Sequence, residues 1–574
     1  MEPTDQGSLA FGPFRISRSE RLLRRGDEVV PLAPKAVDTL IALAESQGRV
    51  LDKAVLMEKV WPDTFIEEGG LARNISMIRK TLGTDDAGND YIETIPRRGY
   101  RFVAPVSKAQ AEGAGVGSLA VLPLLNLSAA PMHEYFADGM TDALISTLMR
   151  IESLRVASRT SVMRYKGANK GLREVARELD VDRVLEGSVL LAGDRVRVAA
   201  SLVRGDNEKH LWAGSYERDL SDVIALQSDL ARTIAREVRV KLSEPERAML
   251  TRVRVVNPEA YHEFLRGRFF WNQRTRESLC LAMECFRKAI TFDPGDAPSH
   301  AGLAETYALL GSVGYDGMPP HAAMPAAREA ALEALRLDPQ LAEAHTALAI
   351  VKLLYDWDWE GAENELLVAL EINPACLAAY QWRGELEMAR ARPEEAAAAF
   401  VRGIKLDPYS ISCNMGLGWA YYFSRRFDQA TLQFERTLEM APHLPMALYG
   451  LGLTLHHNRQ QEKAQQMLRQ AENSSGGEPA SITLLAITAL LSGNAEGASI
   501  QLERLRAMTP HTYVPPVYFA FIHAMRNELD DAFNWLERAF DERSSYLIFL
   551  RLQPALHNLR ADPRFFQLVR RIGQ

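Results

Sequence analysis

A proline that recurs at an almost constant step dominates the C-terminal half of this 574-residue sequence. Helical segments end in a proline five times, at Pro294, Pro339, Pro374, Pro408 and Pro442. The first step is longer than the other three, each of which is about 34 residues. Because proline cannot continue a helix, this period marks a repeated helical unit. The longer first step predicts an additional Gly- and Pro-rich loop at 311–323.

Residues inside each unit indicate a pair of packed helices. The unit that starts at 411 has Gly418 on its first helix and Phe434 on its second, and the preceding unit has Gly384 and Phe400 at the same offsets. Small residues let two helices approach, and large residues fill the space between pairs. This pattern resembles the tetratricopeptide repeat, whose helix pairs stack into a superhelix. The resemblance implies an all-α array of about eight repeats over residues 258–574.

Composition and charge restrict the remaining protein classes. Hydrophobic residues at 47% and charged residues at 25% are typical of globular proteins. The net charge of −7 gives no overall attraction for nucleic acid, so such binding would need a local patch. Four cysteines without a CxxC pair predict buried thiols in a reducing cytoplasm. The sequence shows no secretion signal and no run of about 18 apolar residues, so we expect no membrane association.

The first hundred residues follow a different pattern. Short apolar strands precede two helical stretches, and a third helix is expected over 70–82. Its apolar residues recur at helical spacing and predict one buried face: Leu71, Ile75, Ile78 and Leu82. Its opposite face is polar and basic, with Arg73, Asn74, Ser76, Met77, Arg79 and Lys80. The stretch "YIETIPRRGYRF" at 91–102 then predicts a hairpin with Arg97 and Arg98 at its turn.

Strands, three helices and a final hairpin, in this order, resemble the OmpR/PhoB-type winged-helix DNA-binding domain over 8–106. The hairpin residues are similar to the family's wing signature, and the fit is best in the CadC-like subgroup. The resemblance implies that helix 70–82 enters the major groove and that wing 91–102 enters the minor groove. It implies base contacts for Arg73 and Met77, phosphate or base contacts for Asn74, Ser76, Arg79 and Lys80, and minor-groove contacts for Arg97 and Arg98.

The chemistry of these residues agrees with DNA binding. A helix face with Arg, Asn, Ser and Lys can donate to base edges, and arginine at a hairpin tip suits the negative minor groove. Residues 1–105, however, carry 15 Lys and Arg against 16 Asp and Glu, so this region is not basic overall. The alternative is a winged helix that binds protein. Acidic residues gather in "IEEGG" and "DDAGND", away from the basic face, which favours DNA.

The family resemblance also gives a role to the turn before the third helix. This turn, "WPDTFIEEGG" from Trp61, can contact RNA polymerase in such proteins. The alternative is a packed connecting turn with Trp61 in the core.

The middle of the chain alternates strands and helices. Residues 107–118 are small and Gly-rich and predict a flexible linker. In residues 119–242, the stretch "LRVASRTSVMRY" from Leu154 is expected to be a strand, and GD and DN turns predict antiparallel strands. This order resembles the TolB-like α/β domain, which lies between effector domains and tetratricopeptide arrays in bacterial regulators. The resemblance implies no chemistry for this region.

No motif of catalysis stands out in the sequence. It has no phosphate-binding GxxxxGK[ST] loop, no HExxH and no GxSxG elbow. The glycines of "GAGVG" at 113–117 lack the strand and helix that a dinucleotide loop requires. We therefore expect no catalytic residue, no metal site and no cofactor, and predict that the protein is not an enzyme.

The first helix of each repeat is expected to line an inner groove. Applied to two neighbouring units, this rule gives a groove or ligand patch of Trp419, Tyr422, Tyr449 and His456. Such an aromatic patch suits a peptide, a partner helix or a ring-shaped small ligand. The alternative is that these side chains only fill the interior of the superhelix.

The sequence thus predicts a multidomain protein with an α+β winged helix, an α/β middle domain and an all-α superhelix. The predicted function is sequence-specific transcriptional regulation in the cytoplasm, with double-stranded DNA as partner. RNA polymerase, a protein or small ligand on the repeats, and a second copy in a homodimer are further partners that this reading allows. The alternative is an interaction scaffold in which the winged helix and the repeats both bind protein.

Overall fold

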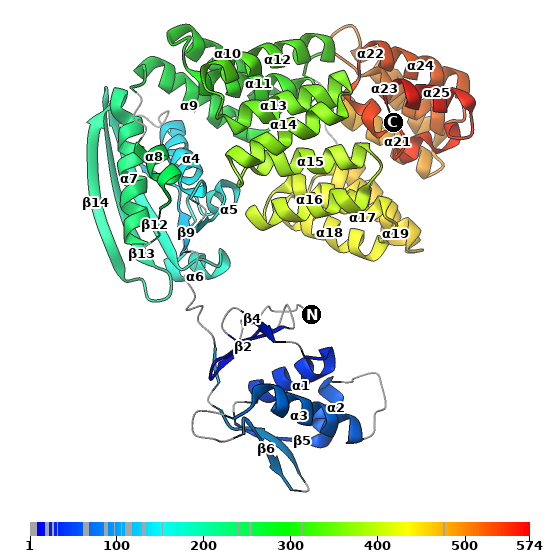
Figure 1. Cartoon of the computed structure of the whole chain (residues 1–574). Coiled ribbons are helices and arrows are strands. Elements are labelled where there is room, and N and C mark those ends of the chain that lie inside the picture. Colours follow the sequence, from blue (N-terminus) through cyan, green and yellow to red (C-terminus); the bar gives the residue numbers. More distant parts are fainter. Residues whose placement is uncertain are drawn as a thin grey trace. The chain divides into compact units, whose positions relative to one another are not determined.

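The computed structural model of the chain divides into two compact units, residues Met1–Gly115 and Val116–Gln574 (Figure 1). It describes residues 9–573 except 18–21, 26–27, 31, 47, 61–67, 85–89, 97, 105, 109–116, 129–133, 152, 169, 239, 241, 252–254, 313, 316 and 475–476. In the described part of the chain, no helix combines the length and the apolar character that crossing a membrane requires.

The first unit packs three helices between two small antiparallel sheets. One sheet has the order β4-β3-β2-β1-β8, from β1 (Leu9–Phe11), β2 (Phe14–Ser17), β3 (Leu22–Arg25), β4 (Glu28–Val30) and β8 (Ser107–Lys108). The other has the order β5-β7-β6, from β5 (Val50–Asp52), β6 (Ile92–Ile95) and β7 (Gly99–Phe102). The helices are α1 (Pro34–Glu45), α2 (Lys53–Val60) and α3 (Glu68–Leu82). This is the winged-helix arrangement that the sequence predicts.

The apolar face of α3 holds this unit together. Its four periodic apolar residues, from Leu71 to Leu82, are all buried, as predicted, in a core with Leu40 of α1 and Phe102 of β7. Gly83 ends the helix at a φ of +69°, a left-handed conformation that glycine adopts at low cost. The opposite face of α3 is therefore free to meet solvent or a partner.

The second unit begins with a mixed sheet of the order β11-β9-β12-β13-β14. Its strands are β9 (Gly117–Val121), β11 (Leu154–Val156), β12 (Arg183–Ala192), β13 (Arg195–Arg204) and β14 (His210–Asp219), with β10 (Leu125–Asn126) paired to β12. The pairs among β11, β9 and β12 are parallel, whereas β12, β13 and β14 form an antiparallel meander. The apolar sides of α4 (Glu134–Met149) and α7 (Val223–Glu237) share the core with this sheet.

The strand predicted for residues 154–165 is wrong over most of its length. Only β11 (Leu154–Val156) is extended, and α5 (Arg159–Met163) follows it. The reason is Ser158, which caps this helix because its Oγ accepts a hydrogen bond from the backbone N–H of Ser161 at 3.2 Å. A short helix, α6 (Leu172–Glu178), then leads to β12.

After α8 (Glu244–Thr251), the chain forms a long series of antiparallel helix pairs, which run from green to red in Figure 1. The pairs are α9 (Pro258–Gln273) with α10 (Arg276–Phe292), α11 (Ala297–Leu310) with α12 (Pro320–Leu337), α13 (Ala342–Val351) with α14 (Trp359–Ile372), α15 (Leu377–Ala389) with α16 (Pro393–Leu406), α17 (Ile411–Phe423) with α18 (Phe427–Met440), α19 (Pro445–His457) with α20 (Gln461–Ser474), α21 (Pro479–Leu491) with α22 (Ala495–Met508), and α23 (Pro516–Met525) with α24 (Leu529–Asp541). The long all-helical region is thus as predicted, whereas the domain boundaries and the number of repeats stay predictions.

The period of the sequence is visible in the backbone. Each of α10, α12, α14, α16 and α18 ends two residues before one of the five periodic prolines. Left-handed residues in the turns within pairs recur at the same period, at Trp357, Ala391, Arg425, Arg459, Gly493 and Asn527. The gap between the end of α11 at Leu310 and the start of α12 at Pro320 confirms a loop in this place, whereas residues 320–323 of the predicted loop belong to α12.

Glycines let the helices close around large aromatic side chains. Phe400 on α16 is fully buried between Gly384 of α15 and Gly416 of α17. A Cβ atom on either glycine would lie 2.5 Å from the Phe400 ring, which is closer than real contacts allow. This close packing explains why the repeats combine a large residue on one helix with small residues on its neighbours.

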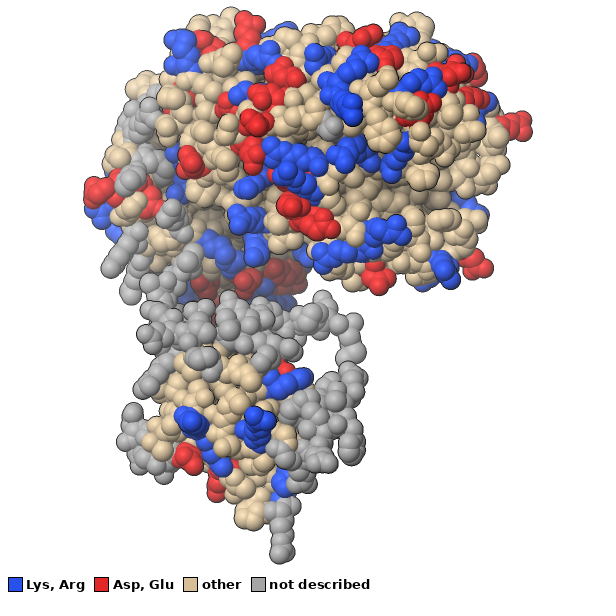
Figure 2. Space-filling view, turned by 45° about the vertical axis from the view of Figure 1, so that its right-hand side comes forward, with Lys and Arg blue, Asp and Glu red and all other residues tan. Residues whose placement is uncertain are grey.

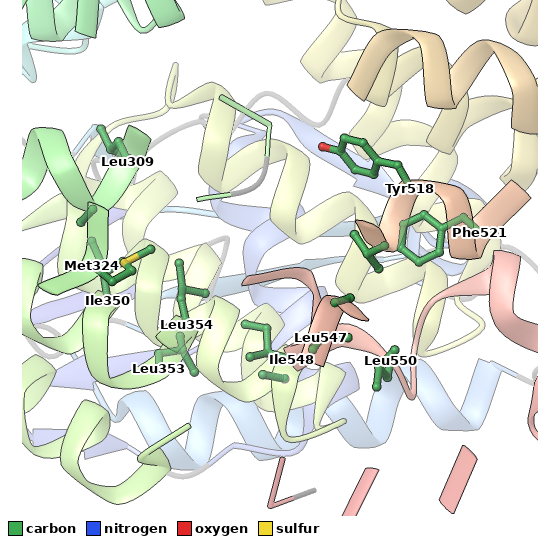
Figure 3. Close-up of a cluster of buried hydrophobic side chains, with 14 of the residues drawn as sticks. Leu309, Met324, Ile350, Leu353, Leu354, Tyr518, Phe521, Leu547, Ile548 and Leu550 are labelled. Carbon is green, nitrogen blue, oxygen red and sulfur yellow. The ribbon is translucent and has the colours of Figure 1, made fainter. Parts of the chain in front are cut away.

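The C-terminal segment closes the array on itself. After α24 come η4 (Ser545–Phe549), η5 (Pro554–Leu559) and α25 (Pro563–Arg571). The Trp359 Nε1–H donates to the backbone oxygen of Ile572 at 3.2 Å, although 213 residues separate them. Leu547 and Ile548 of η4 are fully buried beside Leu353 and Leu354 of the π-helical turn η3 (Lys352–Asp356) (Figure 3). The last turns of the chain therefore line the interior of the superhelix.

Candidate nucleic-acid interface

The exposed face of α3 carries a stripe of free donors. Arg73, Ser76 and Lys80 are exposed and lie on one side of the helix, at i, i+3 and i+7. Among the described residues, neither Arg73 nor Lys80 has an ion-pair or hydrogen-bond partner. Arg73 and Lys80 flank the Ser76 hydroxyl on a helix whose other face is fixed in the core. These three side chains can therefore donate to phosphates and base edges at the same time.

Two of the predicted contact residues turn partly inward. Asn74 is half-buried, and its Nδ2 donates to Oγ1 of Thr39 on α1 at 3.2 Å. Met77 is half-buried and packs against the core of the unit. Both lie at the edge of the exposed stripe, so the roles predicted for them in base contact stay predictions.

Arg79 joins α3 to the hairpin. Its Nε and Nη2 donate to the backbone oxygen of Ile92 at 3.1 and 2.7 Å, and Nη2 also donates to Thr94 Oγ1 at 2.8 Å. Asp90 lies 3.9 Å from its Nε. These contacts with β6 favour a positioning role for Arg79, since they fix the angle between the helix and the wing.

The hairpin forms from β6 and β7 in the predicted segment. Arg98 is exposed near its tip, and its Nε lies 3.6 Å from Asp52 Oδ1. Behind it, the Nε of Arg101 donates across the strands to Glu93 Oε2 at 2.9 Å. Arg97 and residues 61–67 of the proposed polymerase contact lie outside the described residues, and residues 68–70 of that stretch begin α3. Of the predicted minor-groove pair, the structure therefore places Arg98 on the wing surface.

Charge is distributed differently over the two units. On the first unit, Figure 2 shows several Lys and Arg side chains close together on the face in view, with a few acidic side chains near them. On the second unit, basic and acidic side chains alternate over the same face. Basic side chains are thus present on this face of the first unit, although the chain as a whole has a net charge of −7.

The four residues predicted to form a groove patch separate in the array. Tyr449 is buried and lines a cavity inside the superhelix, whereas the other three are not among its lining residues. The Trp419 ring packs 5.4 Å from the ring of Phe434, Tyr422 is buried, and His456 is exposed. Three charged residues that the sequence pattern did not single out line this cavity: Arg274, Glu305 and Glu385.

The cysteines have the properties of inert core residues. All four are free, and burial raises the pKa of Cys285 and Cys413 to about 11 and that of Cys376 to about 12. These three thiols therefore stay protonated at neutral pH and are poor nucleophiles.

One group of described residues has the donor types of a metal site. Donor atoms of His523, Glu528 and Asp531 lie within 4.8 Å of one another. However, His523 Nδ1 lies 2.5 Å from one oxygen of Glu528, and Arg526 Nε lies 2.9 Å from the other. The group is thus paired internally and gives no independent sign of a metal.

Comparison with known proteins assigns the first unit. Residues 26–102 match the family described as "Transcriptional regulatory protein, C terminal". The solved DNA-binding domain of E. coli CadC is 28% identical to this chain, covers 18% of this chain and 98% of that domain, and has a TM-score of 0.17. The first unit is an OmpR/PhoB-type winged helix.

Two curated relatives extend further along the chain. The transcriptional regulator HilA of Salmonella typhi is 24% identical over 439 residues, which are 75% of this chain and 76% of HilA. A putative adenylate cyclase 3 of Rhizobium meliloti (strain 1021) is 40% identical over 187 residues, which are 33% of this chain and 32% of that protein. The chain therefore matches about a third of the cyclase-named relative and about three quarters of HilA.

Proposed function

We propose that this chain, whose first unit is a winged helix of the transcriptional regulator family, is a sequence-specific DNA-binding regulator of transcription. The observation that carries the proposal is the stripe of Arg73, Ser76 and Lys80 on α3, which is exposed and has no ion-pair or hydrogen-bond partner in the described part of the chain. DNA as the target implies work in the cytoplasm.

The proposed complex places α3 in the major groove. Arg73 then donates to a base edge, Lys80 pairs with a phosphate, and Ser76 serves either. Asn74 and Met77 contact the groove wall from the margin of the stripe. The wing tip, with Arg97 and Arg98, lies in the adjacent minor groove, where a narrow groove concentrates negative potential. Arg79 holds the wing at the angle that this requires.

The rest of the chain would supply regulation. In this proposal, the predicted linker of 107–118 joins the two units, with its ends in β8 and β9. Residues 119–242 form a TolB-like domain, and the repeats of 258–574 bind a protein or small ligand. A homodimer would place two winged helices on tandem half-sites, about one helical turn apart. The all-α superhelix suits this task because stacked repeats present an extended inner surface.

The test selects DNA with the full-length protein. Genomic fragments that it captures should share one sequence element, with an affinity at least about 10³ above that for scrambled DNA. Arg73→Gln should relax the selected sequence, and Lys80→Gln should weaken binding to all sequences alike. Lys59→Gln, at an exposed position on α2, is the matched control and should change neither. Capture of unrelated fragments with equal affinity would contradict the proposal.

Contact with RNA polymerase is a finer part of the proposal. The turn that starts at Trp61 would touch the polymerase while α3 holds the DNA. Substitution of its polar residues should abolish activation of a target promoter and leave DNA affinity unchanged. Equal losses of both would show that the turn only supports the fold.

A protein scaffold is the second candidate, favoured by the nearly equal numbers of basic and acidic residues in the first unit. The similarity to HilA, a transcriptional regulator, argues for the DNA reading. A non-enzymatic role is also part of our proposal. The relative named as an adenylate cyclase matches a third of the chain, and an assay of cyclic nucleotide formation from ATP checks that part directly.

A further inference from the structure

The interior of the helical array contains a cavity of about 360 Å³. The first helix of every pair from α9 to α23 contributes to its wall, and η4 contributes Tyr546 and Phe549. Large aromatic side chains dominate this wall, among them Trp271, Trp382 and Tyr449. The volume is within the range of small-molecule sites, about 300–1,000 Å³, and too small for a folded partner.

A single carboxylate on this wall has no partner. Glu385 lies one turn beyond Trp382 on α15, so both side chains are on the same face of the helix. Among the residues that the structure describes, none lies within hydrogen-bonding or ion-pair distance of the Glu385 carboxylate. Burial raises its pKa to about 7, and no neighbouring charge contributes to the shift. Glu385 is half-buried at the cavity wall, and in the described part of the chain its carboxylate has no counter-charge, so it is available to a ligand.

The other charged groups that line the cavity, Arg274 and Glu305, interact with groups other than Glu385. Glu305 on α11 accepts a hydrogen bond from Arg268 at 2.9 Å, although burial still raises the pKa of Glu305 to about 7. Arg274 lies over the Trp271 ring at 3.6 Å, and burial lowers the pKa of its guanidinium, which Glu305 and Tyr315 partly offset. These groups form one cluster at the α9 and α11 side of the cavity, and none of them acts on Glu385.

Two further titratable groups at or near the cavity have raised pKa values. Cys413 on α17 feels the Glu385 charge, and its thiol pKa is about 11. Burial raises the pKa of the Tyr449 hydroxyl well above its usual value. Tyr518 and Tyr546 also line the cavity. On the α15 side of the cavity, Glu385 therefore has no balancing charge among the residues that the structure describes.

We propose that this cavity binds a small organic cation, an amine on an aromatic or aliphatic body, with Glu385 as its counter-ion. The amine donates to the carboxylate, and Trp382 and Tyr449 offer aromatic faces that attract a cation and enclose the body of the ligand. This inference rests on the proposed function, because it identifies the chemical class of signal that the regulator receives. A ligand that contacts both α15 and η4 would join the middle of the array to its C-terminal turn.

Calorimetric titration of the full-length protein without DNA tests the proposal. The probes are 2-phenylethylamine and tyramine, and 2-phenylethanol is the neutral analogue of matched size. At pH 8 we expect each amine to bind the native protein at least about tenfold more tightly than the alcohol does. Glu385→Gln should remove this difference and weaken the amines at least about tenfold. Glu371→Gln, at an exposed position on α14, is the matched control and should change nothing.

A second measurement uses the proton on Glu385. Because the carboxyl must ionise to pair with the amine, affinity should fall about tenfold from pH 8 to pH 6. Glu305 also has a pKa of about 7, so it could contribute to the loss of affinity at pH 6. The part of that loss that is absent in Glu385→Gln is assigned to Glu385.

Failure of both amines to bind, or equal binding by the native protein and Glu385→Gln, would overturn the inference. The regulator proposal would stand in that case, because DNA selection is measured without any ligand. Conversely, loss of DNA binding would leave the amine titration unchanged.

Discussion

The sequence prediction missed Glu385, although the repeat period could have located it. It lies one repeat of 34 residues before Trp419, which is at the predicted inner position of its own unit. Applying the same rule one repeat earlier would have placed a carboxylate among the groove residues. Whether the Glu385 carboxylate has a partner depends on helices that are distant in sequence, such as α11 and α19. A local sequence pattern therefore cannot predict it.

The same limit applies to the recognition helix. Its buried and exposed faces follow from helical spacing, and Arg73, Ser76 and Lys80 are exposed as their pattern predicts. Spacing alone could not show that Asn74 binds Thr39 or that Arg79 binds Ile92. Those partners come from α1 and β6, which tertiary packing brings to α3.

Glu385 gives a prediction about stability and pH. Its folded pKa, about 7, is above its usual 4.5 because burial disfavours the carboxylate. The folded protein therefore binds a proton that the unfolded chain releases between these values. The stabilising contribution is complete below about pH 4.5 and is lost as the pH rises through 7.

We expect Glu385→Gln to raise the free energy of unfolding at pH 8 by about 1–3 kcal/mol relative to the native protein. At pH 5 the difference should shrink to below about 1 kcal/mol, because Glu385 is then protonated in the folded protein. Urea unfolding at the two pH values measures this, with Glu371→Gln as the control. A difference that does not change between pH 5 and pH 8 would contradict the assignment.

At the scale of elements, Arg79 couples α3 to the wing. Arg79→Lys keeps the charge but cannot form the three hydrogen bonds to Ile92 and Thr94. We expect the β6–β7 amides to exchange hydrogen faster and specific DNA affinity to fall about tenfold. Lys80→Arg, which keeps both charge and exposure, should leave amide exchange unchanged. Slower exchange, or none of these effects, would show that Arg79 does not position the wing.

The glycines of the array give a second prediction. Gly416→Ala places a Cβ atom 2.5 Å from the Phe400 ring, so α16 and α17 must separate. Such overpacking costs about 1–3 kcal/mol, which a lower urea midpoint of the array would report. Gly477→Ala, where nothing lies within 4 Å of the added atom, should have little effect. A stable Gly416→Ala protein would mean that Phe400 can move aside.

The sequence predicts best those elements whose apolar residues or repeat units recur at a regular spacing. The helices between 258 and 541 follow from the periodic spacing of the repeats, and α3 follows from its apolar face. The helix at Ser158 was missed because one capping residue overrides an alternating pattern. The η4 segment shows no repeat spacing in its sequence, and its position depends on the helices of the array against which it packs.

For the whole molecule, the return of the C-terminal segment decides how the array holds together. Ile548 is 0% exposed, in the interior of the array beside Leu354 (Figure 3). Ile548→Ala should lower the free energy of unfolding by about 2–4 kcal/mol and increase hydrogen exchange in η3. Leu432→Ala, at a side chain 67% exposed, should do neither. Unchanged exchange in η3 would show that closure is not cooperative.

The most direct test of the central claim is the affinity of the full-length protein for a selected DNA site, measured across salt concentrations. We predict a logarithm of affinity that falls steeply and linearly with the logarithm of salt concentration, because phosphate contacts release counterions. The double variant Arg73→Gln/Lys80→Gln should bind more weakly, and its slope should be shallower by about one for each phosphate contact that it loses. Weak binding that barely responds to salt, and is equal in the two proteins, would contradict DNA recognition by α3 and support the scaffold instead.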